Sequence, residues 1–437
     1  MSSPCLQRRL FASLLAAWMG PAAAQDLAMN APAIDIAWTT RAVAEPHRLR
    51  DDSVFGTGLP LTSFGRDRAR IEQEARGKLG PFNLLATVTA SGQQGAKPDT
   101  RLVAHEAYAD FSLGGERFSL GRKVLSGDVG YAFRPLDVLQ RESRLQLAPP
   151  PLTGIPMIAW DNFGADSAWS LIVTNPGHGP GNAGSTAAAR DDSSLALRVF
   201  RRIASDHRKS LWGADFHGVA RTSARHGLEL GTGFAAVPND AVELHGSLLL
   251  QQRGERRVPL AAGATAAQLL DAARALQVES HGRVGKALLG ATWTAESGLS
   301  AMGELWWDGG ANSADEWRRL RTNAVARNAL RGLPGVPDLA IAGANAASTR
   351  IFEQGNLARR GLLARLAWTE PAGKWSAAAD WMASLDDGGR NLTLSAGYAA
   401  DKWRLDAGLR AYGGKADSAF GLLPERRAAF VTLSASY

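Results

Sequence analysis

The ionisable residues of this 437-residue sequence offer recognition chemistry but no assembled catalytic set. We find no Gly-x-Ser-x-Gly nucleophile motif and no His-Glu-x-x-His zinc motif. The nearest approach to a catalytic pair is Asp215 with His217, two residues apart, which on a strand would share one face. The 8 histidines are scattered without metal-ligand spacing. We therefore expect no enzyme, no cofactor and no metal site.

The charged residues instead follow the pattern of a sheet that separates two environments. Near residues 402–412, apolar side chains such as Trp403 and Leu405 alternate with Arg404, Asp406 and Arg410. A period of two indicates strands with one apolar and one polar face. A soluble sandwich and a membrane barrel with a wet lumen both fit this alternation.

Three features favour the barrel over the sandwich. The chain ends in an alternating segment that finishes on Tyr437, which resembles the C-terminal signal read by outer-membrane insertion machinery. Tryptophans lie near the expected strand ends, as an interfacial girdle requires. They are Trp212, Trp293, Trp307, Trp368, Trp375, Trp381 and Trp403. Tight turns at Glu370–Gly373, Ala295–Gly298, 238–240 and 114–115 alternate with long segments at 124–154, 253–282 and 309–358.

The N-terminal segment predicts export. Arg8 and Arg9 precede an apolar stretch at 10–20 and the small residues Ala22–Ala24, the order found in cleavable signal peptides. We assign residues 1–24 to a signal peptide and 25–437 to the barrel. The single cysteine, Cys5, would leave with the signal, so thiol and disulfide chemistry are not expected.

The fold class follows from these observations: an all-β chain forming a single transmembrane antiparallel barrel of about 18 strands, with 16 as the alternative. Short turns would face the periplasm and long loops the exterior, which places the protein in the cell outer membrane of a Gram-negative bacterium. We expect strands near 34–43, 67–77, 81–91, 101–113, 115–123, 155–163, 167–175, 193–203, 209–221, 228–236, 241–251, 283–294, 298–308, 361–369, 374–384, 391–400, 402–412 and 428–437. Helices at 314–331 and 265–278 fit the long loops.

Basic residues expected in the lumen are the candidate contacts for a solute. A guanidinium presents a planar fork to carboxylate or phosphate, and 47 basic against 42 acidic residues leave the exported chain at +5. The alternative is that the same residues are paired, solvated groups that stabilise the wall. The candidate binding residues are Arg122, Lys123, Arg134, Asp137, Arg365, Arg404 and Arg410. Four of them belong to the region after the fifth strand, which could fold inward as a constriction or stay at the surface.

Residues 120–138 resemble an element of porin-like barrels related to the alginate-export group. There, a strand ending in Gly-Arg-Gln runs into an aromatic-glycine pair and an Asn-Pro-x-Asp turn. Here the corresponding residues are Gly121, Arg122, Lys123, Ser126, Gly127 and Arg134-Pro135-Leu136-Asp137. The resemblance covers about 40 residues and implies a single-chain channel of about 18 strands. Because several motif positions differ, we do not transfer alginate as the substrate.

We therefore predict a channel for uptake or export of a small solute, with an anion as the candidate solute. The alternative is an export or docking barrel that works with a periplasmic complex and passes a lipid or polymer, for which the proline-rich segment at 145–158 is the supporting feature. Expected partners are outer-membrane lipid, lipopolysaccharide and the insertion machinery, and no nucleic acid. A receptor with an N-terminal plug is disfavoured because strands begin within about ten residues of position 25.

Overall fold

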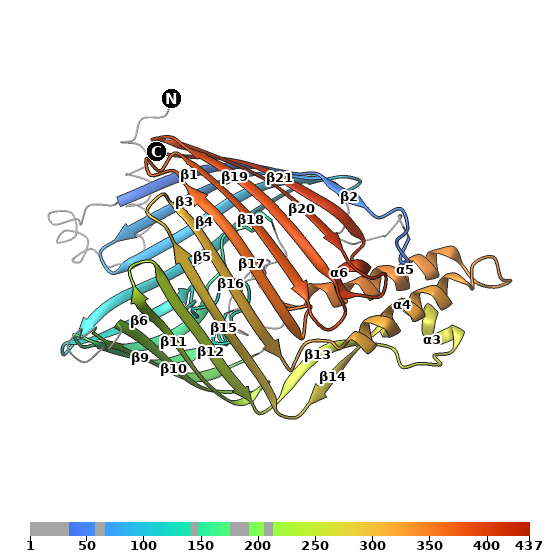
Figure 1. Ribbon diagram of the computed structural model, residues 1–437, viewed down its shortest axis with the longest axis horizontal. Helices are drawn as coiled ribbons and strands as arrows, with labels where there is room; N and C mark the ends of the chain where they lie inside the picture. The colour runs from blue at the N-terminus through green and yellow to red at the C-terminus, as the bar shows by residue number, and fades with distance from the viewer. Residues whose placement is uncertain (1–34, 57–65, 141–146, 175–191, 205–212) are drawn as a thin grey trace, which may run out of the picture.

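Eighteen strands close into one antiparallel β-barrel in the computed structural model (Figure 1). The structure describes residues 35–56, 66–140, 147–174, 192–204 and 213–437. The first strand has two parts, β1 (Asp35–Glu45) and β2 (His47–Leu49), because Pro46 interrupts it and both parts pair with β21 (Glu425–Ser436). The pairing of β1 with β21 closes the ring. The sequence prediction of 18 strands is confirmed.

The remaining barrel strands follow one another around the ring in chain order. They are β3 (Arg68–Leu79), β4 (Phe82–Gln93), β5 (Asp99–Leu113), β6 (Glu116–Lys123), β7 (Ile155–Phe163), β8 (Ser167–Thr174), β9 (Ser194–Ile203), β10 (Gly213–Ser223), β11 (Gly227–Asn239), β12 (Val242–Gln251), β15 (Val284–Thr294), β16 (Leu299–Asp308), β17 (Arg360–Thr369), β18 (Trp375–Ser384), β19 (Arg390–Ala399) and β20 (Trp403–Gly413).

Apolar and polar side chains separate between the two faces of the wall as the alternation predicts. On β20 and β21, outward Leu409, Val431 and Leu433 are 44–48% exposed. An apolar side chain so exposed on a closed barrel is suited to lipid rather than water. Arg404 and Asp406, which face the lumen, form an ion pair at 2.8 Å.

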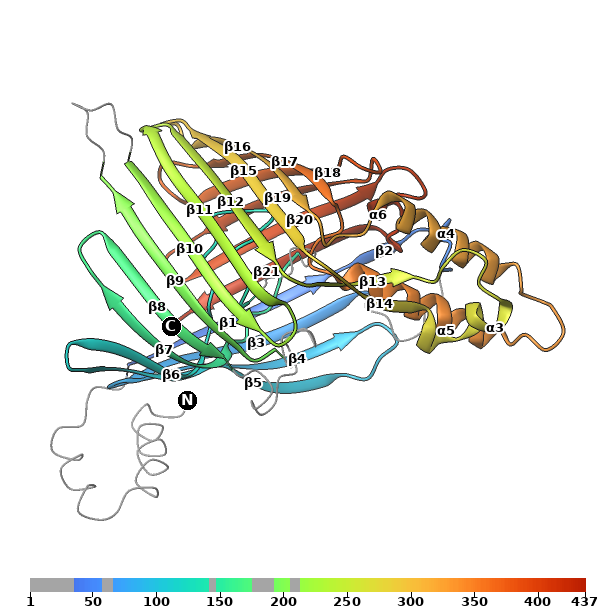
Figure 2. The ribbon, with the colours of Figure 1, turned by 90° about the horizontal axis from the view of Figure 1, so that it is seen from below.

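The two ends of the barrel differ in the length of their connections. The four tight turns named from the sequence all join strands at the end where β1 begins and β21 finishes, which we call the terminus end. The long segments 124–154, 253–282 and 309–358 all connect strands at the other end, the loop end (Figures 1 and 2). Several of the predicted interfacial tryptophans, including Trp293, Trp368, Trp375 and Trp403, lie on the outer face at the terminus end. Trp212 falls outside the described residues, as do residues 1–34.

Helices form a lid beyond the loop end (Figure 2). They are α3 (Ala266–Leu270), α4 (Ala314–Asn328), α5 (Asp338–Ser348) and α6 (Ala419–Leu422), with 3₁₀ turns η4 (Ala272–Arg274) and η5 (Thr349–Glu353). Ser313 and Glu316 cap α4 reciprocally. Trp317 of α4 stacks on Phe352 with ring centroids 5.6 Å apart, in a buried cluster that also contains Phe55 and Phe420. No helix among the described residues is long and apolar enough to cross a membrane.

The helix predicted at 265–278 is largely wrong. Only Ala266–Leu270 is α-helical, and β14 (Leu276–His281) pairs with β13 (Gly254–Pro259) in a separate two-stranded sheet. Its backbone groups find partners across that hairpin, which outweighs the helical pattern of its apolar residues. The helix predicted at 314–331 is confirmed as α4, whereas α5 was not predicted because its short, alanine-rich sequence carries a weak periodic signal.

Candidate functional site

The described residues of the segment between β6 and β7, 124–140 and 147–154, fold into the barrel and are the candidate functional site. Its neck is held by three hydrogen bonds. The Val124 N–H donates to the Glu106 carboxylate at 2.9 Å, and the Leu125 N–H donates to the Gln140 side chain at 3.0 Å. Gln140 in turn donates to the Thr153 carbonyl at 3.0 Å. We call this segment the inner loop.

A buried carboxylate on the wall holds the backbone of the inner loop at residues 131–132. Glu304 of β16 accepts the N–H groups of Tyr131 and Ala132 at 2.6 and 2.7 Å, one on each carboxylate oxygen. Its side chain is fully buried, and the His245 imidazole lies 3.0 Å away. Two hydrogen bonds to one buried carboxyl group are strong and directional. Glu304 therefore fixes the position of the backbone at 131–132.

Apolar contacts against glycines bring the inner loop close to the wall. A Cβ added at Gly231 of β11 would lie 2.5 Å from a Leu136 methyl carbon, and one added at Gly233 would lie 2.9 Å from the other. The absence of a side chain at these two glycines therefore leaves room for Leu136. Leu136 packs with Val138, Val219 and Leu249 in one buried cluster. Phe133 stacks on Trp306 with ring centroids 6.2 Å apart. Because buried leucine and phenylalanine each contribute about 1.5–3 kcal/mol, these contacts favour the docked arrangement.

Two buried aspartates organise the inner loop from within. Asp137 accepts the Gly127 N–H at 3.0 Å, and Asp128 accepts the N–H groups of Val129 and Leu136. Burial raises the pKa of Asp128, and burial likewise raises the pKa of Asp137, despite these hydrogen bonds. The docked loop therefore carries carboxylates whose charged form is destabilised by their surroundings.

The second half of the inner loop is attached to another part of the ring. Arg41 of β1 donates to the Pro149 carbonyl at 2.8 Å, and Arg70 of β3 donates to the Ala148 carbonyl. The closed strand order places eight strands between β1 and β11 in either direction, so the anchors at Leu136 and Pro149 lie on opposite sides of the ring. The described parts of the inner loop thus contact both halves of the barrel wall.

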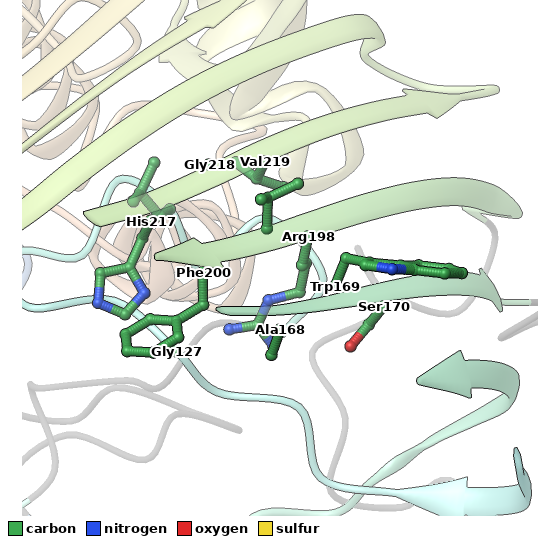
Figure 3. A pocket seen from close by; sticks show the side chains of 11 residues that line it. Gly127, Ala168, Trp169, Ser170, Arg198, Phe200, His217, Gly218 and Val219 are labelled. Atoms are coloured by element: carbon green, nitrogen blue, oxygen red, sulfur yellow. The ribbon is translucent and has the colours of Figure 1, made fainter. Parts of the chain in front are cut away.

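A pocket of 220 Å³ opens where the inner loop meets β8, β9 and β10 (Figure 3). The Arg198 guanidinium lies against Gly127, 1.5 Å from where a Cβ would stand. The Phe200 and His217 rings lie next to each other, with centroids 5.3 Å apart. Ser170 adds a hydroxyl to the lining. Cationic, aromatic and hydroxyl groups therefore converge at the edge of the inner loop.

Comparison with solved structures identifies the architecture. OccK11 (OpdR) of Pseudomonas aeruginosa superposes with a TM-score of 0.51 over 92% of this chain and 95% of that chain, at 10% identity. OccK5 (OpdH) of the same organism gives a TM-score of 0.50 over 92% and 97% of the two chains, at 8% identity. The barrel is porin-like. A mutant of Rh. blastica porin also matches, with a TM-score of 0.41 over 93% and 100% of the chains and 11% identity.

The likeness concerns the fold alone at these identities. No family model matches the chain, and no curated protein matches its sequence.

The candidate residues predicted from the sequence occupy different parts of this porin-like barrel. Arg365 faces the lumen, pairs with Asp380 at 2.6 Å and donates to the Tyr131 hydroxyl of the inner loop at 2.8 Å. Arg404 and Arg410 face the lumen on β20, and Arg410 donates to Thr393 at 2.7 Å. These three residues lie on the arc β17–β20 of the ring, where Arg365 contacts Tyr131 of the inner loop.

The remaining candidates lie at or within the inner loop. Arg134 donates to the Gly130 carbonyl at 2.9 Å and lies 3.5 Å from Asp137, which is buried. Lys123 faces the lumen at the neck, 3.2 Å from Asp110 and over the Tyr108 ring. Arg122 takes the opposite face of β6 from Lys123 and donates to the Ala104 carbonyl at 3.4 Å. The structure thus brings Arg134 and Asp137 together within the inner loop and places Arg365 against Tyr131 of the same loop.

Sequence reasoning did not single out the residues that position the inner loop. Glu304, Arg41, Arg198 and the glycines of β11 are not among the candidate residues predicted from the sequence. The sequence Gly-Thr-Gly at 231–233 interrupts the apolar pattern of β11. Glycines in a strand can indicate that another segment of the chain packs closely against it. Nothing local indicates that Arg198 meets Gly127, because the two are 71 positions apart.

Proposed function

We propose that this chain is an outer-membrane channel that passes small solutes, with a preference for anions, through the lumen beside the inner loop. The observation that carries the proposal is the inner loop itself, held inside the barrel by Glu304 on one side and by Arg41 on the other. A loop fixed in this way narrows the lumen without filling it with a separate domain. The terminus end would then face the periplasm and the loop end the exterior.

The preference for anions is supported by the guanidinium groups on the lumen wall. A guanidinium has five N–H donors, and an ion pair with one carboxylate uses only some of them. The Arg404 side chain is 55% exposed despite its pair with Asp406, so donors remain directed into the lumen. Arg365 and Arg134 add further guanidinium groups where the inner loop approaches the wall. A carboxylate or phosphate solute would meet these donors in sequence.

The alternative function, an export or docking barrel that works with a periplasmic complex, is less well supported than the channel. The described residues of the proline-rich segment bind the inner wall through the Pro149 and Ala148 carbonyls and so face the lumen. An inner-wall segment is poorly placed to bind a periplasmic complex. The resemblance of residues 120–138 to the alginate-export-related group stays a prediction from the sequence, as do insertion through the strand ending at Tyr437 and cleavage after residue 24.

Single-channel conductance in planar bilayers tests the proposal. We expect stable open steps and, in a salt gradient, a reversal potential that indicates anion selectivity. The double variant Arg404→Gln/Arg410→Gln should shift the reversal potential toward cation selectivity. Arg274→Gln, which changes an exposed lid residue, should leave it unchanged. A folded barrel that carries no current would contradict the channel, and selectivity unaffected by the double variant would contradict the anion preference.

A further inference from the structure

Three exposed arginines lie on the outer face of the barrel at the loop end. They are Arg48 of β2, Arg390 of β19 and Arg427 of β21. Their chain neighbours His47, Asn391 and Ala428 face inward and are buried or nearly so. Because successive residues of a strand point to opposite faces, the three arginines point outward. Leu392 and Val431 share their face and are 41% and 47% exposed.

The strand register gathers the three arginines into one patch, the outer arginine patch. Arg48 is directly opposite Arg427. On β20, Ala411 is opposite Arg427 and Gly413 is opposite Arg390. The patch therefore extends over four adjacent strands, with Arg390 two residues nearer the loop end than Arg427. Neighbouring strands are about 4.8 Å apart, which gives a patch on the order of 15 Å wide.

The outer arginine patch has no partner within the part of the chain that the structure describes. None of the three side chains makes a hydrogen bond or ion pair there. Two like charges directly opposite on neighbouring strands repel each other. Neighbouring Arg360, on the outer face of β17, differs because it pairs with Asp386 at 2.6 Å. An anion bound between Arg48 and Arg427 would remove the repulsion.

The height of the patch on the barrel identifies the environment of that anion. Trp403 begins β20 at the terminus end and contacts Tyr398, whose ring also contacts Trp375. Eight to ten residues separate Trp403 from Ala411 and Gly413. At about 3.4 Å per residue and a tilt of about 40°, this distance is roughly 20–26 Å along the barrel axis. The apolar band of such barrels is about 25 Å tall, so the patch lies at the opposite interface.

We propose that the outer arginine patch binds the phosphate groups of lipopolysaccharide in the outer leaflet. The proposal rests on the proposed function, because it needs the loop end to face outward. Arginine matches phosphate with two parallel hydrogen bonds, and three guanidinium groups in a row fit a lipid that carries more than one phosphate. Binding would hold the lipid against the leucine and valine side chains below the patch.

The test compares lipid binding by two matched variants. Detergent-solubilised protein is titrated with bisphosphorylated lipid A and with its dephosphorylated form, and bound lipid is measured by native mass spectrometry. The triple variant Arg48→Gln/Arg390→Gln/Arg427→Gln removes the patch. The control is Arg201→Gln, because Arg201 is also exposed and outward, beside Phe216, but lies near the terminus end.

We expect the wild type and Arg201→Gln to bind bisphosphorylated lipid A alike, and the triple variant to bind it at least about tenfold more weakly. The dephosphorylated lipid should bind all three proteins equally weakly. Equal binding by the triple variant, or an equal loss in Arg201→Gln, would overturn the proposal. Competition by inorganic phosphate at concentrations matching the lipid would assign the patch to free phosphate and also overturn it.

Conductance of the triple variant in a phosphatidylcholine bilayer separates this inference from the channel itself. The patch lies outside the lumen, so we expect wild-type steps. Wild-type conductance together with unchanged lipid binding would refute the patch and leave the channel intact. Absence of conductance in both proteins, with lipid binding lost only in the triple variant, would refute the channel and retain the patch.

Discussion

The carboxylate of Glu304 on the barrel wall accepts the backbone N–H of Tyr131 in the inner loop at 2.6 Å. The second carboxylate oxygen accepts the next N–H along the loop, and the whole side chain is excluded from solvent. One residue of β16 therefore holds the backbone at 131–132 against the lumen wall.

Replacing this carboxylate should loosen the inner loop without unfolding the barrel. In Glu304→Gln an NH₂ group replaces one carboxylate oxygen and faces one of the two backbone N–H groups of the loop. Because two donors then face each other, that hydrogen bond is lost and neither donor has an acceptor. We expect docking to weaken by about 1–3 kcal/mol. Hydrogen exchange of the amides in 124–140 should accelerate, whereas the amides of β16 should not change. Glu296→Gln, in an exposed turn, is the control, and equal exchange in both variants would show that Glu304 does not hold the loop.

Because the inner loop is closely packed, adding one methyl group at Gly130 should strongly disturb its backbone. A Cβ at Gly130 would stand 2.0 Å from the Phe133 carbonyl oxygen and 2.5 Å from a Leu288 methyl carbon. Gly130→Ala should therefore displace the loop backbone, at a cost of about 1–3 kcal/mol, and increase cleavage of the loop by a protease added to both sides of the membrane.

Gly343→Ala provides the contrasting substitution. Gly343 lies inside α5, and apart from the helix's own backbone nothing lies within 4 Å of an added Cβ. Alanine should stabilise the helix by about 0.5–1 kcal/mol and leave loop cleavage unchanged. If both glycine variants raised loop cleavage, the steric explanation for Gly130 would be wrong.

The two buried aspartates predict that the inner loop docks more firmly in acid. Burial raises the pKa of both Asp128 and Asp137 above their ordinary value of 3.8. A group whose pKa is raised in the docked state contributes stability that is complete below the ordinary pKa and is lost as pH rises through the raised pKa. Open-channel current noise caused by loop motion should thus decrease as pH falls from 7 toward 4.

The variant Asp128→Asn/Asp137→Asn checks the origin of this pH dependence. It has no charge at these positions at any pH, so its noise should change little over the same range. Noise that rises on acidification in the wild type, or falls equally in the variant, would exclude the two aspartates as the titrating groups.

The lid should unfold separately from the barrel when its core is opened. Trp317 is 1% exposed and stacks on Phe352, so Trp317→Ala removes the largest fully buried side chain of the lid. We expect a loss of about 3–5 kcal/mol, seen as a lower-temperature transition in the near-ultraviolet circular dichroism. The barrel should keep its electrophoretic resistance to heat. Leu339→Ala, at a 77% exposed position, should behave as the wild type.

The sequence by itself determined the barrel. Period-two alternation along strands such as 402–412, together with turn residues such as those at 370–373, encodes each strand and each short connection locally. Eighteen strands could be located because every one carries its own alternation. The helix α4 could also be predicted, since Trp317 and Leu320 recur at helical spacing behind a Ser313–Glu316 cap.

Only the tertiary structure decided how the lumen is narrowed. The contacts that matter join residues far apart in the chain, such as Tyr131 with Glu304 and Pro149 with Arg41, and no local periodicity encodes them. Closure of the ring brings β1 beside β21, which places Arg48 opposite Arg427 and creates the outer arginine patch. The alternation of apolar and polar residues predicts which face of the barrel wall a side chain occupies. Ring closure and the docking of the inner loop determine which residues that side chain contacts.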